Sequence, residues 1–337
     1  MTSIGIIANP NSGKDIRRLI SHASVIDNGE KINIVERIIL GAQSLGVEKV
    51  YMLSDFNKIG YRVKDRLSTR KLLKCEIELV ELPYYNNFKD TMHITEFMEK
   101  RDVGCIVTLG GDGTNRALAK VIKDTPIITI STGTNNVYPA MIEGTIAGMA
   151  AAAVASNKFD KNSYAIKDKR IEIFRNSELV DIALVDAVIS DETYIASKAI
   201  WDMENIHKIF VTRSHPASIG FSSIVGCKII VSPQDDYGAY ININNSEYAV
   251  TAPVSAGMME PVSVGEPKVL NVGEEHEFTA TERGTIALDG EKEVEFSPGD
   301  TFIFKISRNG PYHVDAVKAL EVAQRGGFLN TAPKISH

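Results

Sequence analysis

The stretch IVTLGGDGTNRALAKVI, residues 106–122, places three glycines around one carboxylate, Asp112. Glycine costs roughly 0.5–1 kcal/mol relative to alanine inside regular structure. The cluster therefore indicates a backbone that turns sharply or approaches another group closely. The apolar run before it predicts a strand over 105–110, and the apolar spacing after it predicts a helix over 115–124. Asp112 would then stand at the start of a helix, where an aspartate can also serve simply as a cap.

The first part of the chain alternates β-branched runs with longer helical patterns. Further strands are expected at 3–9, 49–54, 76–82 and 126–131, and further helices at 33–46 and 91–101. This alternation predicts a parallel sheet with helices on both faces. Ligands bind at the carboxyl edge of such sheets, where glycine amides and a helix N-terminus can face phosphate oxygens. We therefore expect a phosphate-bearing ligand at residues 110–114.

The pattern changes near residue 143. Residues 143–158 form an Ala-rich helix pattern whose small side chains would allow close packing at a domain junction. Downstream, short segments alternate apolar and polar residues with turn residues between them, as strands do. A length of 337 residues suits two domains. We predict an α/β domain over 1–158 and a β-rich, sandwich-like domain over 159–313, with residues 314–337 returning to the first domain.

Composition narrows the class of partner. The net charge is −6, and a nucleic-acid partner would need a basic surface, so we expect none. No apolar run approaches the roughly 18 residues of a membrane span, and the N-terminus lacks the pattern of a signal peptide, so we expect a cytoplasmic protein without a membrane partner. The three cysteines have no paired spacing and suggest neither disulfides nor zinc. Small molecules remain the expected ligands.

Asp112 would repel a phosphate group. It fits better as an acceptor of the proton of an attacking hydroxyl, or as a ligand that holds Mg²⁺ against phosphates. Two more polar loops, residues 8–15 and 131–139, follow strands at the same expected edge. The first is not a P-loop, because it has no glycine at position 8 and an aspartate at position 15. A late tight turn, LDGEKEVEF at 288–296, adds Asp289 and Glu291.

Taken together, these segments resemble the NAD kinase and diacylglycerol kinase superfamily. TLGGDGTNRAL resembles its GGDGT signature, NPNSGK its first phosphate-side loop, GTNNVYP its GTGND loop, and LDGE its late DGE turn. Within the superfamily, GIIANPNSGKDIRRL and STGTNNVYP most resemble the branch that contains the acetoin catabolism X protein. The resemblance covers most of the chain. It implies an α/β domain and a β-sandwich domain that enclose a nucleotide, with ATP and Mg²⁺ as cofactors and a homo-oligomeric assembly.

Roles carried over by position follow from this resemblance. Asp112 matches the catalytic aspartate, a general base for the acceptor hydroxyl. The residues that match the nucleotide loops are Gly110, Gly111, Gly113, Thr114, Asn9, Ser12, Gly13 and Asn136. Asp289 and Glu291 match the DGE turn and are expected to bind substrate.

Two departures weaken the case for NAD as the phosphate acceptor. NAD kinases carry an Asn-Glu or Asn-Asp pair after a strand of the β domain, whereas this chain has Val185 and Asp186. They also carry a GSTAY-like stretch, of which this chain keeps only Ser255, Ala256 and Gly257. We therefore expect an ATP-dependent kinase that phosphorylates a hydroxyl of a small metabolite, with Asp186 as a substrate contact. A nucleotide-binding regulator without activity and a lipid kinase are the alternatives.

Overall fold

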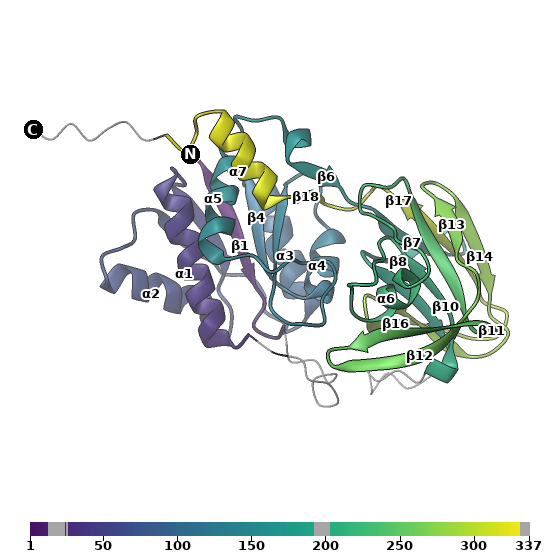
Figure 1. The fold of residues 1–337 in the computed structure, drawn as a ribbon. Helices are drawn as coiled ribbons and strands as arrows, with labels where there is room; N and C mark the ends of the chain where they lie inside the picture. The colour runs from purple at the N-terminus through teal and green to yellow at the C-terminus, as the bar shows by residue number, and fades with distance from the viewer. Residues whose placement is uncertain (13–23, 25, 192–202, 331–337) are drawn as a thin grey trace, which may run out of the picture.

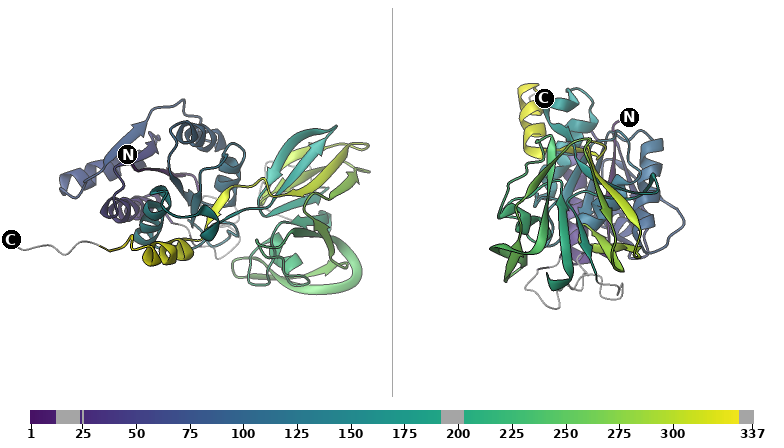
Figure 2. Two further views of the ribbon diagram at one scale, coloured as in Figure 1. Left: turned by 90° about the horizontal axis from the view of Figure 1, so that it is seen from above. Right: turned by 90° about the vertical axis from the view of Figure 1, so that its right-hand side faces the viewer.

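The computed structural model describes residues 1–12, 24, 26–191 and 203–330. It contains an α/β domain followed by a mostly antiparallel β domain (Figure 1), which confirms the predicted fold class. Seen from above (Figure 2, left), the domains lie beside each other, and the C-terminal part of the chain, drawn in yellow, runs from the β domain back along the α/β domain. Within the described residues, no helix is long and apolar enough to cross a membrane.

The sheet of the α/β domain has the strand order β3-β2-β1-β4-β5-β18-β6. Its strands are β1 (Ser3–Ala8), β2 (Lys49–Leu53), β3 (Glu76–Val80), β4 (Cys105–Gly110), β5 (Ile127–Ser131), β6 (Ala165–Lys167) and β18 (Tyr312–Val314). The first five pair in parallel and begin and end within two residues of the predicted ranges. Strands β4 and β5 lie in the middle and are buried at every position, which explains their continuous apolar runs.

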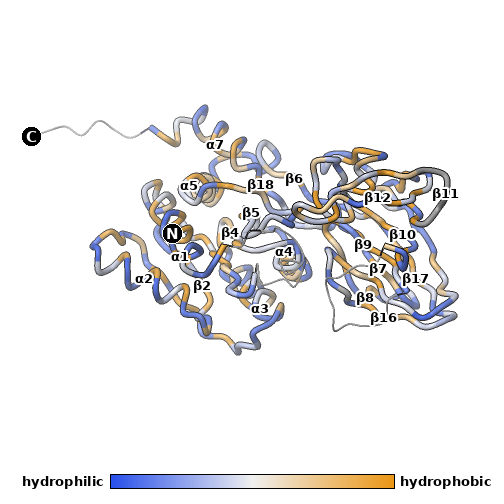
Figure 3. Tube along the Cα trace, turned by 60° about the horizontal axis from the view of Figure 1, so that its bottom comes forward, coloured by the Kyte–Doolittle hydropathy of each residue, from blue (hydrophilic) through white to orange (hydrophobic). Residues whose placement is uncertain are grey.

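Helices cover both faces of this sheet. They are α1 (Asn28–Ser44), α2 (Ile59–Thr69), α3 (Phe88–Lys100), α4 (Asp112–Ala119), α5 (Gly144–Ala155) and α7 (Ala316–Arg325). Residues of α1, α2, α5 and α7 share one core with the sheet, while residues of α3 and α4 share the other. Helix α2 buries Ile59, Val63 and Leu67 at helical spacing, and it accordingly alternates hydrophilic and hydrophobic colours along its length (Figure 3).

The β domain consists of two packed sheets. Its strands are β7 (Arg170–Arg175), β8 (Glu178–Ala183), β9 (Asp186–Ser190), β10 (Ile206–Val211), β11 (Tyr237–Ser255), β12 (Met258–Val264), β13 (Lys268–Asn271), β14 (Glu275–Thr279), β15 (Gly284–Leu288), β16 (Glu291–Phe296) and β17 (Thr301–Ser307). One sheet has the order β12-β11-β10-β9-β15-β16, with β13 on β11, and the other has the order β14-β17-β7-β8. Side chains of both sheets, such as Phe210 and Phe304, which stack at 4.3 Å, form the core between them. The short helix α6 (Phe221–Gly226) covers the other face of the larger sheet.

The chain passes between the domains twice. After α5 it forms the 3₁₀ turn η2 (Lys161–Ser163) and then β6, so it remains in the first sheet beyond residue 158, where the domain boundary was expected. After β17 it returns as β18, which pairs with both β5 and β6. Helix α7 then packs its Ala316 and Ala319 into the α/β core.

The Ala-rich helix α5 packs against α1 and α7, so its close packing occurs inside the α/β domain rather than at the domain junction. Glycines permit the approach to α1. A Cβ on Gly148 would lie 2.1 Å from the Ile38 carbonyl oxygen, and one on Gly41 would lie 2.6 Å from the Thr145 carbonyl oxygen. Because these neighbours are backbone atoms, a larger residue can be accommodated only by moving one helix away from the other.

Gly148→Val should therefore lower the free energy of unfolding by about 1–3 kcal/mol, the usual cost of overpacking. Urea unfolding would measure the change. Ile146→Val, which alters an exposed side chain of the same helix, is the matched control and should change stability by less than about 0.5 kcal/mol. Equal stability of the two variants would contradict the close-packing account.

Candidate functional site

The loop between β4 and α4 shows why three glycines surround Asp112. A Cβ on Gly110 would lie 2.5 Å from Thr114, and one on Gly111 would lie 2.7 Å from Asn136 Oδ1. A Cβ on Gly113 would lie 3.0 Å from a carboxylate oxygen of Glu291, which belongs to the β domain. The glycines are therefore explained by close approach of neighbours on the loop itself, on a second loop and on the second domain.

Asp112 occupies the first turn of α4, one residue after the N-cap, Gly111. The helix thus starts three residues earlier than predicted, and the N-cap position that was considered for Asp112 belongs to Gly111. The Asp112 carboxylate accepts hydrogen bonds from the backbone N–H groups of Tyr138, at 2.8 Å, and Val137, at 3.1 Å. These bonds fix the orientation of the carboxylate and tie α4 to the loop after β5.

The three polar loops expected at one sheet edge do meet there. The Asn9 amide donates to Thr114 Oγ1 at 2.9 Å, and the Thr132 hydroxyl donates to Ser12 Oγ at 3.0 Å. The Asn136 amide donates to Ser131 Oγ at 2.9 Å. The structure thus brings Asn9, Ser12 and Asn136 together with the glycine loop. Gly13 lies outside the described residues.

Lys31 is a residue of this edge that sequence reasoning missed. It lies in the first turns of α1 and is 1% exposed. Its ammonium group donates to the backbone oxygens of Asn9 and Ser12, both at 2.9 Å. A buried cation beneath residues 9–12 favours a phosphate at this edge. The sequence offered little signal, since Lys31 stands two residues before the predicted helix, next to another charged residue, Glu30.

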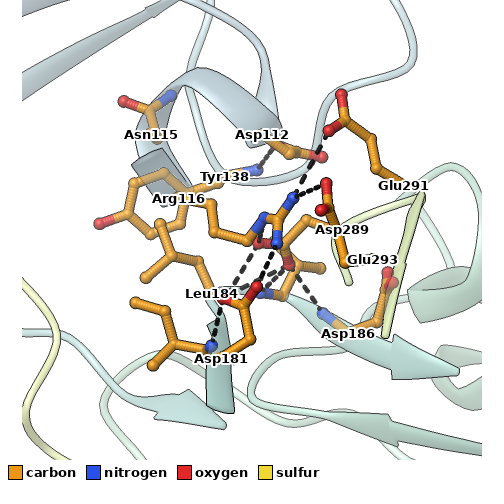
Figure 4. A network of polar contacts seen from close by, with 12 residues as sticks. Asp112, Asn115, Arg116, Tyr138, Asp181, Leu184, Asp186, Asp289, Glu291 and Glu293 are labelled. Atoms are coloured by element: carbon orange, nitrogen blue, oxygen red, sulfur yellow. Dashed lines mark hydrogen bonds and ion pairs between the residues drawn. The ribbon is translucent and has the colours of Figure 1, made fainter. Parts of the chain in front are cut away.

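Arg116 lies one helical turn after Asp112 on α4 and joins the two domains. Its guanidinium group, on a side chain only 5% exposed, faces four carboxylates of the β domain (Figure 4). The distances are 2.8 Å to Glu293, 3.4 Å to Glu291, 3.5 Å to Asp181 and 3.8 Å to Asp289. Burial opposes the charge of the guanidinium, but the carboxylates outweigh it and raise the pKa of Arg116. We refer to these five residues as the Arg116 cluster.

Asp289 holds the β-domain side of the site together. Its φ is 51°, and its fully buried carboxylate accepts hydrogen bonds from the backbone N–H groups of Val185 at 2.7 Å, Leu184 at 3.0 Å and Asp186 at 3.2 Å. Burial raises the pKa of this carboxyl, while Arg116 and the backbone donors oppose the rise. The sequence had indicated both Val185–Asp186 and the late turn with Asp289 as parts of the site. The hydrogen bonds to Asp289 hold Val185 and Asp186 in place.

A second contact between the domains involves the loop after β5. The Asn135 amide donates to Ser255 Oγ at 3.3 Å, and the Ala256 N–H donates to Asn135 Oδ1 at 3.2 Å. The stretch with Ser255, Ala256 and Gly257 therefore lies beside the same loop that holds Asp112.

The ring of Tyr138 lies against two side chains, His313 and Arg213. Its ring stacks on His313, with centroids 4.9 Å apart, and the Arg213 guanidinium lies 4.7 Å from its centroid. Asp168, which is fully buried, contacts Arg213 at 3.0 Å and His313 at 3.1 Å. Burial alone would raise the pKa of Asp168, but Arg213 and His313 lower it to about 2. These contacts were not predicted from the sequence. They fix the position of Tyr138, whose backbone N–H binds Asp112.

Each of the two domains matches a known protein family. Residues 4–158 match the ATP-NAD kinase N-terminal domain, and residues 169–309 match the acetoin catabolism protein X C-terminal domain. Acetoin catabolism protein X of Cupriavidus necator is 32% identical over 345 residues, which cover 98% of this chain and 95% of that protein. The crystal structure of yeast NADH kinase complexed with NADH has a TM-score of 0.54 and 13% identity, and covers 100% of this chain and 90% of that chain. At this identity the structural match shows a shared fold.

Arg116→Met should destabilise the protein by about 3–5 kcal/mol, because it leaves the fully buried carboxylate of Asp289 without its cation. Arg175→Met is the matched control. Its partner Asp300 is 2.6 Å away, but the Arg175 side chain is 38% exposed, so we expect a loss below about 1 kcal/mol. Urea unfolding would measure the free energy of unfolding of both variants. An equal loss in the two variants would show that the Arg116 cluster does not hold the domains together.

Asp168 should make stability depend on pH in the acid range. Its pKa is lowered in the folded protein from 3.8 to about 2, so its contribution is complete above about pH 5 and is lost as the pH falls toward 2. The contribution is about 2 kcal/mol. The difference in stability between the native protein and Asp168→Asn should therefore shrink between pH 6 and pH 2.5 in urea titrations.

The control for this measurement is Asp236→Asn, whose carboxylate is 88% exposed. Its difference from the native protein should stay nearly constant over the same pH range. A constant difference for Asp168→Asn as well would show that Arg213 and His313 do not keep Asp168 ionised in the folded protein.

Proposed function

This chain belongs to the family of acetoin catabolism protein X, and on that premise we propose that it transfers the γ-phosphoryl group of ATP to a hydroxyl of a small metabolite. The kinase fold rests on the match to the ATP-NAD kinase N-terminal domain and on the likeness to NADH kinase. The single observation that carries the reaction is the position of Asp112. Its carboxylate is oriented by two backbone amides, in the glycine loop whose Gly113 lies next to Glu291 of the β domain.

The phosphates of ATP would lie against the N-terminus of α4 and the polar loops around Asn9 and Asn136. The helix dipole and the N–H groups of the first turn favour negative charge there. Lys31 adds a fixed positive charge next to residues 9–12, because its side chain is already held by the Asn9 and Ser12 backbone oxygens. The protein therefore supplies electrostatic stabilisation that needs no rearrangement when charge develops on the transferred group.

In the chemical step, Asp112 accepts one proton. As the acceptor oxygen forms its bond to the γ-phosphorus, the bond from that phosphorus to the bridging oxygen breaks and ADP leaves. The hydroxyl proton passes to the Asp112 carboxylate, which acts as the general base. The backbone bonds from Val137 and Tyr138 keep the carboxylate aimed during this transfer.

The resemblance also implies Mg²⁺. Within the described parts of the chain, no group of three or more His, Cys, Asp or Glu side chains is arranged to hold a metal ion. Mg²⁺ in nucleotide sites is commonly held by one or two carboxylates together with phosphate oxygens, and Asp112 is the carboxylate of the glycine loop that fits this role. When bound, Mg²⁺ would neutralise phosphate charge.

The acceptor would bind on the β-domain side, near Glu291, Asp289 and Asp186. Glu291 has a side chain 48% exposed, whereas Asp289 and Asp186 are almost fully buried. A bound acceptor can therefore reach Glu291 most easily. Asp186 becomes a contact only if the acceptor inserts a polar group beside the start of β9.

Asp112→Asn should lower turnover by roughly 10²–10⁴-fold while the affinity for ATP changes little, because the amide keeps the shape but cannot take the proton. Transfer of labelled γ-phosphate with Mg²⁺ and ATP, together with calorimetric ATP binding, would separate the two effects. Asp124→Asn, whose carboxylate is 81% exposed, is the matched control and should retain native turnover. An Asp112→Asn variant with native turnover would exclude the general-base role.

NAD should be a poor acceptor, because Val185 is fully buried and has no polar side-chain atom with which to bind ribose hydroxyls. A transfer screen with NAD, NADH, small diols and nucleosides would test this, with Asp186→Ala as a second arm. Efficient phosphorylation of NAD would contradict the prediction and leave the kinase proposal intact. Tight ATP binding without transfer to any compound would favour the alternative of a nucleotide-binding regulator.

A further inference from the structure

Among the described residues, two lysines and a histidine of the β domain lie close together without an acidic partner. Lys208 is on β10, Lys268 on β13 and His276 on β14, so both sheets of the domain contribute. Lys208 Nζ lies 2.8 Å from His276 Nε2. We refer to these three residues as the Lys208 group. None of their strands carries a residue of the site proposed for phosphoryl transfer.

The strand register places Lys268 beside the other two residues. Tyr240 of β11 is directly opposite Lys268 in one pairing and directly opposite Phe210 in another, so the three side chains share a face of the sheet. Lys208 stands two residues before Phe210 on the same strand and faces the same way. The ring of His276 comes from the other sheet, with its centroid 4.4 Å from that of Tyr240. The Lys208 group therefore converges on one place.

The ammonium group of Lys208 is only partly hydrated. Its Nζ lies 5.1 Å from the ring centroid of Tyr240 and 5.9 Å from that of Phe210. These distances approach the limit of about 6 Å for cation–π contacts, so the rings offset little of the lost hydration. Burial, and after it the charge of Lys268, lowers the pKa of Lys208 below its usual value. No carboxylate of the described chain pairs with Lys208 to oppose this change.

His276 is placed to act as the base for this amine. Because an ammonium group only donates hydrogen bonds, the Nε2 atom that faces it accepts the bond and carries no proton. Burial and the charges of Lys208 and Lys268 lower the pKa of His276, which keeps the ring neutral at neutral pH. A lysine is activated as a nucleophile when it is desolvated or lies next to another cation. The Lys208 group thus combines a nucleophile, a base and a second positive charge.

We propose that Lys208 is a modification site that is acylated by small acyl phosphates. Such a donor joins a reactive carbonyl carbon to a phosphate group. Lys268 is exposed, and no carboxylate of the described residues balances its charge, so it attracts that phosphate. The carbonyl carbon of the donor is thereby brought to Lys208.

The reaction converts the ammonium group of Lys208 into an amide. Lys208 first loses one proton to solvent. Its nitrogen then bonds to the carbonyl carbon while the bond from that carbon to the phosphate oxygen breaks. The second proton passes from the nitrogen to His276 Nε2 and on to the phosphate that leaves. The product has lost the positive charge of the lysine.

The proposal is independent of phosphoryl transfer from ATP, and its test uses acetyl phosphate as the probe. The full chain would be incubated with acetyl phosphate at about pH 7.5, and mass spectrometry of its peptides would give the acetylation rate of each lysine. Lys305 is the internal reference, because it lies in the same domain, is 32% exposed and pairs with Glu275 at 3.0 Å. We expect Lys208 to react roughly fivefold faster or more, since a lower pKa leaves more of the amine unprotonated.

Three variants test the roles within the Lys208 group. Lys268→Met removes the neighbouring charge, and His276→Phe removes the base but keeps a flat ring. Each should slow the acetylation of Lys208 by roughly fivefold or more and leave that of Lys305 unchanged. Lys318→Met, at a 57% exposed position on α7, is the matched control and should leave both rates unchanged. Circular dichroism would check that the variants are folded.

Two results would overturn the proposal. One is a native protein in which Lys208 is acetylated no faster than Lys305. The other is a native rate at Lys208 in Lys268→Met or in His276→Phe, because neither neighbour would then take part.

Discussion

The arrangement of the two domains depends on one buried cation. Arg116 extends from α4, four residues after Asp112, into a group of four carboxylates on the β domain. A guanidinium in this position costs several kcal/mol of desolvation unless it is paired. Among the four carboxylates, the fully buried Asp289 depends most on Arg116, because Asp181 also pairs with Lys120 at 2.8 Å and Glu291 is 48% exposed. The ion pairs therefore hold the helix that starts at the glycine loop in a fixed relation to the late turn with Asp289. The same contacts set how far the glycine loop lies from the β domain, where Gly113 approaches Glu291.

The loop after β5 connects this site to the rest of the interface. Through its backbone, Tyr138 holds Asp112, and through its ring it contacts His313 and Arg213. His313 lies on β18, at the second chain crossing, and it contacts Asp168, at the first crossing. Because Arg213 lies on the β domain and also contacts Asp168, the position of the proposed base is linked to both chain crossings.

The sequence predicted what depends on local pattern. The parallel strands, the β-rich second domain and the position of Asp112 at a strand-to-helix turn follow from periodicity and from the glycines, and the structure agrees. Arg116 and Lys31 were missed, because their importance comes from partners far along the chain and not from their neighbours in a helix. Asp168 and His313 are 145 positions apart, and no pattern in either segment indicates that they meet. The start of α4 was placed too late, since glycines were taken to end regular structure while Gly111 instead caps the helix.

We infer that the phosphates of ATP bind at the glycine loop, between α4 and the loop after β5. Hydrogen–deuterium exchange of the native protein with and without MgATP is the decisive measurement, because it locates the nucleotide without assuming any acceptor. We expect slower exchange in residues 110–115 and 131–138 when MgATP is present, with little change in β13 and β14 of the β domain. Unchanged exchange in both loops at saturating MgATP would contradict this site.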